Sequence, residues 1–488
     1  MVLIKGKVTD QKGNALQGVT ITLKDYNRAI TTSATGEFLF LAPNHRTLLF
    51  TSVGYRRREV KINGAAVINV AMEVDIAELD VTQVIAYGTT TKRFNTGEQT
   101  TVTSKEIENY PVANVLTALQ AKVPGVMISQ TSGVPGSPVS VNIRGQNGIS
   151  SGSSPLYIVD GIPYTMDEYV TLNSNIAHGG FLGQNPLNFI NPLDIESVDI
   201  LKDADATAIY GSRGANGVIL ITTKKGRSGA TRVTLNAYTG ISQVPYMPKM
   251  LNLQQYLQMR HEAKRNDGLP VSAFDYDING AWDTTRSTNW AKELLGNGQT
   301  TNAQVSVSGG GANSSYLLSG NYRRQNNLEK LFGGSDHTAS LHFSMGTTSQ
   351  DGKFTASLTG GYTYNVSDIP PGDQFSTIIS LAPDAPKLFN SDGSLNFQNN
   401  TFNANPALAA RKLNRTSINN LLSSAVIAYR PFPGLELKAT VGYNKQQMNE
   451  FNGTPISANA PALGVTTGAV QFYHQQQYLL EHRAAGYL

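Results

Sequence analysis

Hydrophobic and polar residues alternate with a period of two from about Thr231 to the end of the chain. The clearest segment is Leu435–Asn444, LELKATVGYN, in which every second residue is apolar or aromatic. Successive side chains of a strand point to opposite faces, so each such segment predicts a β-strand with one apolar and one polar face. The strands predicted in this way are Val233–Ile241, Ala303–Val307, Tyr316–Tyr322, Ala339–Met345, Phe354–Tyr364, Leu421–Tyr429, Leu435–Tyr443 and a last one near Val470–Leu480.

The polar face of these strands is mostly small and neutral, and tyrosines recur towards the strand ends. Alternating strands of about ten residues with aromatic ends and long connecting loops are typical of an outer-membrane β-barrel. No apolar run approaches the length of a membrane-spanning helix, which such a barrel does not need. A soluble β-sandwich is the alternative that the pattern alone leaves open.

Composition bounds the class of protein. There is no cysteine, so the sequence predicts no disulfide framework and no thiolate metal site, which fits an exported protein. Lys and Arg total 39 against 35 Asp and Glu, and a net charge of +4 is too small to argue for nucleic acid as a partner. Met1 leads directly into VLIKGKV, so we expect that a signal peptide is not present in this chain.

Residues 1–75 predict a small β-sandwich of short strands separated by turn residues. The predicted strands are Val2–Val8, Val19–Leu23, Glu37–Leu41, Thr47–Thr51, Glu59–Ile62 and Val67–Met72. The predicted core is Val8, Val19, Ile21, Phe38, Phe40, Leu49, Val60 and Val70. Tyr55 with the arginines at 56–58 could form a ligand-binding patch, but a charged edge strand protected from further pairing is the preferred interpretation.

Residues 76–96 predict a linker that contains an unusual β-prone segment, Leu79–Gly88. An apolar extended segment buries nothing locally in a linker. It therefore either docks on the next domain or is held for a partner that pairs with it as an added strand.

Residues 97–226 predict a mixed α/β domain with glycine-rich loops. Val112–Lys122 predicts a short amphipathic helix. Strands are predicted at Val126–Ser129, Val139–Arg144 and Leu156–Val159, and Asp160–Gly161 predicts a tight turn.

This α/β domain ends in a compact unit, Asn191–Gly226. A strand over Ile195–Leu201 is followed by Asp203, a predicted N-cap for a helical turn over Ala204–Tyr210. Three glycines then break the helix, namely Gly211, Gly214 and Gly217. Val218–Thr222 predicts a strand buried on both faces, and because the glycines precede a strand they do not form a dinucleotide fingerprint.

Catalytic and metal-binding patterns are weak throughout the sequence. Asp275–Gly280, DYDING, imitates the start of a calcium loop, but Arg286 stands where the bidentate carboxylate belongs, so an ordinary extracellular loop is preferred. His261–Lys264 lacks the second histidine of a zinc helix, and there is no phosphate loop and no Ser/His/Asp order. We therefore predict that the protein is not an enzyme and uses no cofactor.

Four motifs occur in a fixed order. They are IKGKVTDQKGNALQGVTITL, LDVTQVIAYGTTTKR, NVLTALQAKVPGVMISQTSGVPGS, and DIESVDILKDADATAIYGSRGANGVILITTKKG, with STNWAKELL as weaker support further on. In this order they resemble the carboxypeptidase-regulatory-like extension, the TonB-box segment and the two halves of the plug domain of SusC/RagA-type TonB-dependent outer-membrane transporters of Bacteroidota. STNWAKELL is similar to the first barrel segments of that family.

The resemblance implies a mainly β protein: residues 1–75 as the carboxypeptidase-regulatory-like β-sandwich, 76–96 as the linker with the TonB box, 97–226 as the plug, and 227–488 as the N-terminal portion of a transmembrane β-barrel. The implied TonB box is Val81, Thr82, Gln83, Val84, Ile85, Ala86 and Tyr87. The implied plug signature is Asp194, Glu196, Asp203, Tyr210, Gly211, Arg213, Gly214 and Gly217. Within the box, Thr82-Gln83 replaces a usual acidic residue, but strand pairing uses backbone groups and tolerates such a change.

The function implied by the resemblance is import across the outer membrane, with the N-terminal domain and TonB box in the periplasm. TonB with ExbB and ExbD would supply energy, a SusD-like surface lipoprotein would act as a lid, and the substrate would be an oligosaccharide or a peptide. A barrel of about 22 strands would be needed around a plug of this size, so the predicted strands make an incomplete barrel, as in a truncated or split gene product. We expect no heat-modifiable barrel from this chain alone.

Two other functions remain open. One is import of siderophores or cobalamin by a TonB-dependent receptor. The other is a surface-binding β protein that does not transport. Deletion of the TonB box should abolish uptake and spare binding, which separates transport from binding alone.

Overall fold

A computed structural model describes residues 2–11, 13–24, 29–52, 55–64, 66–73, 82–85, 88–91, 99–130, 132–137, 139–145, 154–164, 186–202, 208–369 and 375–487. The chain divides into two compact units, Met1–Thr96 and Gly97–Leu488. Within these described ranges, no helix has the length and apolar character needed to cross a membrane.

The first unit contains two β-sheets that share one hydrophobic core. One sheet has the order β4-β1-β7 and the other the order β3-β2-β5-β6. The strands are β1 (Val2–Asp10), β2 (Thr20–Leu23), β3 (Ala29–Thr31), β4 (Glu37–Ala42), β5 (Thr47–Ser52), β6 (Tyr55–Lys61) and β7 (Val70–Met72). Phe38 of β4 and Phe50 of β5 meet edge to face across the sheets, with ring centroids 5.7 Å apart. The predicted β-sandwich is therefore confirmed.

Three details of this domain differ from the prediction. Leu48 and Phe50 are fully buried and Leu49 is not, so the core face of β5 was predicted one residue out of step. Strand β6 begins at Tyr55, four residues before the prediction, and Val60 packs against the core only in part. β6 is an outer strand of its sheet and its arginines are exposed, as the charged-edge interpretation requires.

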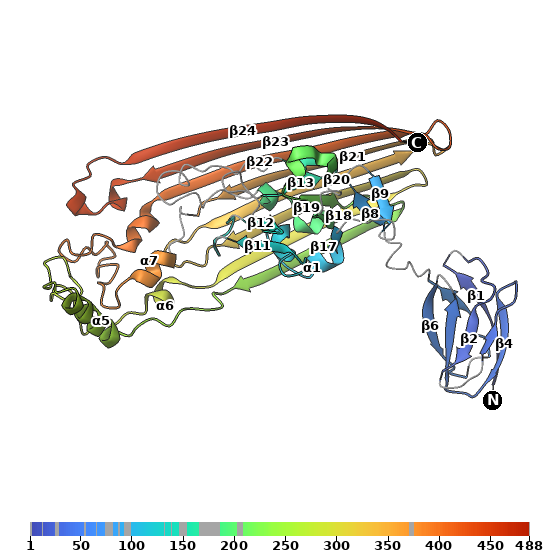
Figure 1. Cartoon of the computed structure of the whole chain (residues 1–488), viewed down its shortest axis with the longest axis horizontal. Coiled ribbons are helices and arrows are strands. Elements are labelled where there is room, and N and C mark those ends of the chain that lie inside the picture. Colours follow the sequence, from blue (N-terminus) through green and yellow to red (C-terminus); the bar gives the residue numbers. More distant parts are fainter. Residues whose placement is uncertain are drawn as a thin grey trace. The chain divides into compact units, whose positions relative to one another are not determined.

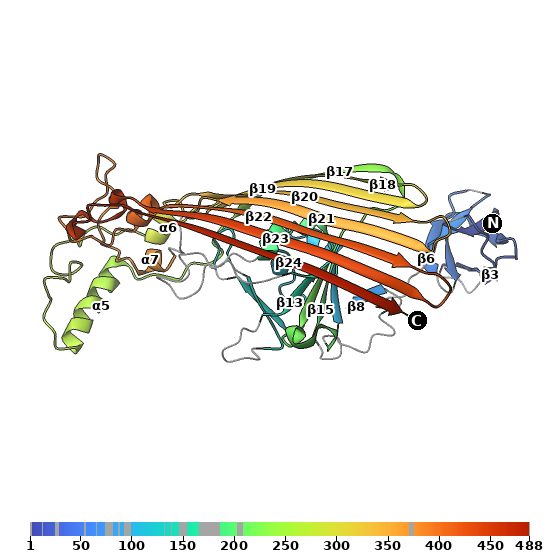
Figure 2. The ribbon, with the colours of Figure 1, turned by 90° about the horizontal axis from the view of Figure 1, so that it is seen from above.

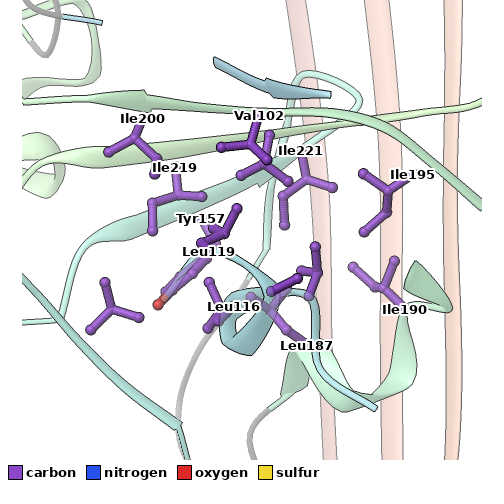
Figure 3. Close-up of a cluster of buried hydrophobic side chains, with 14 of the residues drawn as sticks. Val102, Leu116, Leu119, Tyr157, Leu187, Ile190, Ile195, Ile200, Ile219 and Ile221 are labelled. Atoms are coloured by element: carbon purple, nitrogen blue, oxygen red, sulfur yellow. The ribbon is translucent and has the colours of Figure 1, made fainter. Parts of the chain in front are cut away.

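The α/β part of the second unit, residues 99–223, is named the plug. Its main sheet has the order β10-β15-β16-β13-β14, with a separate hairpin of β11 and β12. The strands are β10 (Gln99–Thr103), β11 (Val126–Gln130), β12 (Val139–Ile143), β13 (Leu156–Val159), β14 (Ile162–Tyr164), β15 (Ile195–Leu201) and β16 (Val218–Thr223). Apolar side chains from these strands and from two short helices form one core, shown in Figure 3. Five of the six residues of β16 are buried, as predicted for a strand covered on both faces.

The helices of the plug are shorter than predicted. The predicted helix over 112–122 is reduced to one turn, α2 (Val115–Ala118). Asn114 caps it by accepting a hydrogen bond from the Leu116 N–H, so the helix begins late, and the left-handed φ of 61° at Ala121 prevents its continuation. A helix that was not predicted, α1 (Ser104–Glu108), begins at a capping box formed by Thr103 and Glu106.

Only the end of the predicted helical turn over 204–210 lies within the described residues. Residues 208–210 belong to η4 (Ala208–Gly214), which consists of two 3-10 turns before β16. Gly211, with φ of 60°, forms the kink between them, so this glycine breaks the helix as predicted but a second turn follows. Asp203, the predicted N-cap, lies outside the described residues.

The rest of the second unit is an eight-stranded antiparallel sheet, named the wall, in which β17 to β24 follow one another in chain order. The strands are β17 (Gly229–Ser242), β18 (Gly298–Gly310), β19 (Ser314–Asn326), β20 (Ser335–Thr348), β21 (Phe354–Ser367), β22 (Leu413–Tyr429), β23 (Glu436–Thr454) and β24 (Ala469–Tyr487). Every strand predicted from the alternation is confirmed and is longer than predicted. β17 and β24, both described in full over these bounds, are the outer strands and do not pair with each other.

The two ends of the wall differ. At one end the strands are joined by short turns, such as residues 311–313 between β18 and β19. At the other end the connections are long, and they carry α5 (Leu253–Asn266), α6 (Trp290–Leu294) and α7 (Phe375–Ser380). Figures 1 and 2 show these three helices together at one end of the curved sheet and the plug strands against one of its faces.

In the wall, the exposed face is apolar and the covered face is polar, which is the reverse of a sheet in a water-soluble protein. Leu235 is 75% exposed and Val441 is 49% exposed on the outer face, whereas Asn302 and Asn444 on the inner face are 3% and 1% exposed. An apolar outer face with a polar inner face is the arrangement expected of strands that contact lipid outside and a plug inside.

Candidate functional site

The plug contacts the wall through polar groups and through a small buried apolar cluster of Phe189 with Ile418 and Met448, and this contact surface is named the plug–wall interface. Thr363 of β21 donates a hydrogen bond to the carbonyl oxygen of Phe189 at 2.7 Å, and His342 of β20 contacts the carbonyl oxygen of Lys224 at 3.0 Å. Arg323 of β19 donates to the carbonyl oxygen of Ala113 at 3.0 Å. The wall therefore contacts mainly the backbone of the plug, and side-chain hydrogen bonds of this kind are individually weak enough to exchange.

Tyr164 is a plug residue whose side chain is held by the wall. It lies at the end of β14, is 1% exposed, and its hydroxyl oxygen accepts hydrogen bonds from the side-chain amides of Asn420 on β22 and Gln446 on β23, both at 2.9 Å. Burial raises the pKa of Tyr164 above its usual range, so the phenol stays neutral. Nearby, Ile162 lies so close to Gly442 of β23 that a Cβ there would be 2.2 Å from the Ile162 Cδ1. These contacts fix the β13–β14 hairpin of the plug against two neighbouring wall strands.

Asp194 is the plug-signature residue that reaches the wall. It ends the 3-10 turn η3 (Pro192–Asp194), is 5% exposed, and accepts a hydrogen bond from Gln304 of β18 at 2.7 Å. The Asn191 side-chain amide donates to the second carboxylate oxygen of Asp194 at 2.9 Å. The backbone carbonyl oxygen of Asp194 accepts a hydrogen bond from the Lys224 N–H at 2.8 Å. Asp194 thus joins the entry of β15, the exit of β16 and the wall.

The other plug-signature residues are dispersed. Glu196 pairs at the surface with Arg227 at 3.0 Å, Tyr210 is buried, and Arg213 is exposed. Gly217 has φ of 91°, and a Cβ there would lie 2.6 Å from the Ile143 Cδ1 and 3.2 Å from the Leu201 carbonyl oxygen. Among the signature residues that the structure describes, Asp194 thus hydrogen-bonds to the wall, whereas Gly217 is constrained by the fold of the plug itself.

Gly226, the last residue of the motif that begins at Asp194, marks the passage from plug to wall. A Cβ at this position would lie 2.4 to 2.6 Å from the backbone atoms of Tyr316 on β19. Only glycine permits this approach, because backbone atoms cannot move aside as the end of a flexible side chain can.

The implied TonB box is described only in part. Thr82–Ile85 forms β8, which pairs antiparallel with β9 (Gly88–Thr91). Val81, Ala86 and Tyr87 lie outside the described residues. The described half of the box is thus an extended strand, the backbone conformation that pairing with a partner strand needs.

The segment that imitates a calcium loop is occupied by basic side chains. Arg260 of α5 contacts the carboxylates of Asp275 at 3.1 Å and Asp277 at 2.5 Å, and Lys264 contacts Asp275 at 2.6 Å. The hydrogen bond from Lys264 and those from Ser272 hold the pKa of Asp275 below its usual range. Among the described residues, no group of three or more His, Cys, Asp or Glu side chains is arranged to hold a metal ion.

The interface residues Tyr164, Gln304, Asn420 and Gln446 were not identified from the sequence. For Gln304, Asn420 and Gln446 the sequence signal is an amide on the polar side of an alternating strand, which several other wall positions share, and Tyr164 carries no such signal. A cavity of about 40 Å³ among Asp194, His342, Asn420 and their neighbours is large enough for buried water, which would satisfy further polar groups of the interface.

Two family models match the chain. The model "TonB-dependent Receptor Plug Domain" matches residues 91–218, and the model "CarboxypepD_reg-like domain" matches residues 4–86. Together they cover most of the N-terminal β-sandwich, strand β8 and most of the plug.

Curated relatives match over a longer range. The chain is 32% identical over 464 residues to TonB-dependent receptor P26 of Formosa agariphila, covering 93% of this chain and 44% of that protein. It is 30% identical over 343 residues to TonB-dependent receptor SusC of Bacteroides thetaiotaomicron, covering 70% of this chain and 32% of that protein. The chain therefore spans less than half the length of these relatives.

A solved structure of the RagAB peptide importer in its "open-open" state shares the fold, with a TM-score of 0.68 and 22% identity over 83% of this chain and 46% of that one. The fold agrees with the two domain matches and the two relatives. By its plug, its N-terminal domain and its relatives, this chain belongs to the SusC/RagA type of TonB-dependent receptors.

Proposed function

We propose that this chain supplies the N-terminal domain, TonB box, plug and first barrel strands of an outer-membrane importer for glycans or peptides. TonB-dependent receptors of this family are outer-membrane transport proteins and not enzymes. In this proposal, residues 1–75, 76–96, 97–226 and 227–488 are the four functional parts. The short turns of the wall and the TonB box face the periplasm, and the long connections face the exterior, since outer-membrane barrels have short periplasmic turns.

The observation that supports this function best is the polar plug–wall interface. Asp194, Tyr164 and backbone carbonyl groups of the plug are held by wall amides and hydroxyls, and beside them lies a small apolar cluster of Phe189, Ile418 and Met448. Each such bond exchanges for a bond to water at a small net cost of about 0.5–1.5 kcal/mol. A plug held in this way can be displaced by a pull and can return.

The pull would act through β8. SusC- and RagA-type receptors work with TonB and with SusD- or RagB-like lipoproteins. We propose that residues 81–87 pair with TonB, energised by ExbB and ExbD, and that a SusD-like lipoprotein covers the long connections.

The test is uptake by cells that express the receptor from its complete reading frame, with and without residues 81–87. We expect the deletion to abolish energy-dependent uptake and to leave binding at the cell surface intact. The control is a variant in which the order of residues 88–94 is scrambled. It changes the segment after the box but keeps its length and composition, and uptake should persist. Uptake that persists after the deletion would contradict the proposal, and binding without any energised uptake by the intact receptor would favour the surface-binding alternative. Uptake of ferric siderophores or cobalamin in place of glycans and peptides would favour the other alternative.

A further inference from the structure

A cleft of about 1040 Å³ opens among the long connections of the wall. One side comes from the segment after β17 and the other from α6 and α7 (Figure 1). Its apolar lining is mostly aliphatic or thioether in character. The residues that carry this character are Val244, Met247, Met250, Leu251, Ile379 and Leu381.

The charge of the cleft is of one sign. Lys249, Lys292 and Lys330 line it, and no aspartate or glutamate is among its lining residues in the described part of the chain. All three lysines are exposed, and none pairs with a described carboxylate. Lys264 at the same end of the wall is different, because it pairs with Asp275 at 2.6 Å. The three lysines of the cleft are therefore not engaged in ion pairs with described carboxylates, and a concave surface concentrates their field.

Lys330 is linked to α6, which carries Lys292. The Lys330 ammonium donates a hydrogen bond to the carbonyl oxygen of Lys292 at 3.1 Å, so Lys330 lies beside that helix. Lys249 stands on the facing segment, next to Met250. An anionic group in the cleft would therefore meet ammonium groups from both sides.

The lining does not suit a sugar ring. A saccharide packs its flat face on an exposed aromatic ring and gives its hydroxyl protons to carboxylates. Trp290 is only 5% exposed and its indole N–H donates to the Ala382 carbonyl oxygen at 2.8 Å, so its ring is not free for stacking. Tyr256, the other aromatic residue of the lining, is half-buried, and its hydroxyl donates to Asp277 at 2.9 Å. Methionine and branched aliphatic residues instead adapt to apolar side chains of different shapes.

We propose that this cleft binds a short peptide with aliphatic side chains and acidic groups, its carboxylates held by Lys249, Lys292 and Lys330. The proposal rests on the importer function above and specifies one of its two substrate classes. Apolar walls with a few convergent charged groups are the usual composition of a ligand pocket, and the lysine rim selects the charge of the ligand.

The test uses the receptor purified from its complete reading frame, without TonB, and three probes. These are a hexapeptide of alternating aspartate and leucine, its lysine–leucine counterpart, and a neutral hexasaccharide. Calorimetry at low and high salt measures the affinity. We expect the acidic peptide to bind, more weakly at high salt, and the other two probes not to bind.

Variants locate the site. The double substitution Lys249→Gln and Lys292→Gln should weaken binding of the acidic peptide about tenfold, at roughly threefold for each exposed charge contact. Lys387→Gln, an exposed lysine of the same end outside the cleft, should change nothing. All three lysines are on the surface, so the variants should fold.

Three results would overturn the proposal. They are equal binding of both peptides, binding of the saccharide alone, or no binding of any probe to a folded receptor, as when other protein segments fill the cleft. Binding is measured on purified receptor without TonB, so these results do not test the importer function. Uptake that survives deletion of residues 81–87 would refute the importer function but would not test peptide binding in the cleft.

Discussion

The side-chain amide of Gln304 donates a 2.7 Å hydrogen bond to the carboxylate of Asp194 and so joins wall strand β18 to the plug. The same amide nitrogen lies 2.7 Å from the hydroxyl oxygen of Ser319 on β19. Asp194 is a residue of the plug signature, and Gln304 is one of several amides on the inner face of the wall. The contact therefore connects a motif that the sequence displays to a partner that the sequence does not single out.

Gln304→Leu should loosen the plug around Asp194. The substitution leaves a buried carboxylate with one hydrogen-bond partner fewer, at a cost of about 1–3 kcal/mol. Hydrogen exchange measured on the receptor should show faster exchange at residues 192–196. Gln299→Leu, an exposed position on the same strand, is the control and should not change the exchange rates.

Tyr164→Phe should make the plug easier to displace. The change removes the oxygen that accepts from Asn420 and Gln446 and leaves two buried amides without that acceptor, again at about 1–3 kcal/mol. The measurement is the force needed to pull the plug out by the N-terminal domain in single-molecule experiments.

Tyr157→Phe is the matched control for this prediction. Tyr157 is also 1% exposed, but its hydroxyl makes no hydrogen bond to the wall in the described part of the chain. An equal drop in force for both variants would mean that the Tyr164 hydroxyl has no special part in holding the plug.

The fold was predictable from the sequence wherever a local pattern carries it. The two-residue alternation predicted all eight wall strands, because successive side chains of a strand point to opposite faces of the sheet. The pattern failed at Leu48-Leu49-Phe50, where three apolar residues in a row hide which alternate pair is buried. It also failed for α2, because an asparagine cap and a left-handed alanine decide its length.

The plug–wall interface was beyond the reach of the sequence. Tyr164 lies 256 residues from Asn420 and 282 from Gln446, so no local periodicity relates them. Each residue alone is an ordinary strand residue. The TonB-box assignment stays a prediction that rests on resemblance, with β8 as its described part.

Gly226→Ala should prevent the wall from closing on the plug. The added Cβ would overlap the backbone of Tyr316 on β19, and relief requires a shift of a paired strand, at a cost of about 1–3 kcal/mol or more. We expect less folded receptor in the outer membrane, measured by protease resistance. Gly240→Ala in β17 is the control, since a Cβ there meets nothing within 4 Å; a loss of the same size at both positions would refute the steric explanation.

Asp384→Asn should stabilise the long connections above pH 6 and have little effect at pH 4. Asp384 is 0% exposed and its carboxylate oxygens receive no hydrogen bond from the described residues. Burial, with a smaller contribution from the charge of Asp277, raises the pKa of Asp384 to about 6. A carboxyl group whose pKa is higher in the folded state contributes stability at low pH and loses it as the pH rises from about 4 through about 6. Asparagine is neutral throughout and keeps that stability.

The fluorescence of the two tryptophans of this chain, Trp282 and Trp290, reports on this region, because the Trp290 indole donates to Ala382 close to Asp384. The unfolding temperature measured by this fluorescence should be higher for Asp384→Asn than for the natural protein above pH 5, and the same for both below it. Asp392→Asn is a control with the opposite expected effect. The hydrogen bonds from Ser394 lower the pKa of Asp392, so the charged carboxylate stabilises the fold above about pH 4. Its replacement should therefore lower the unfolding temperature at neutral pH. If Asp384→Asn is less stable than the natural protein at pH 7, the carboxylate has an ionic partner and the burial explanation is wrong.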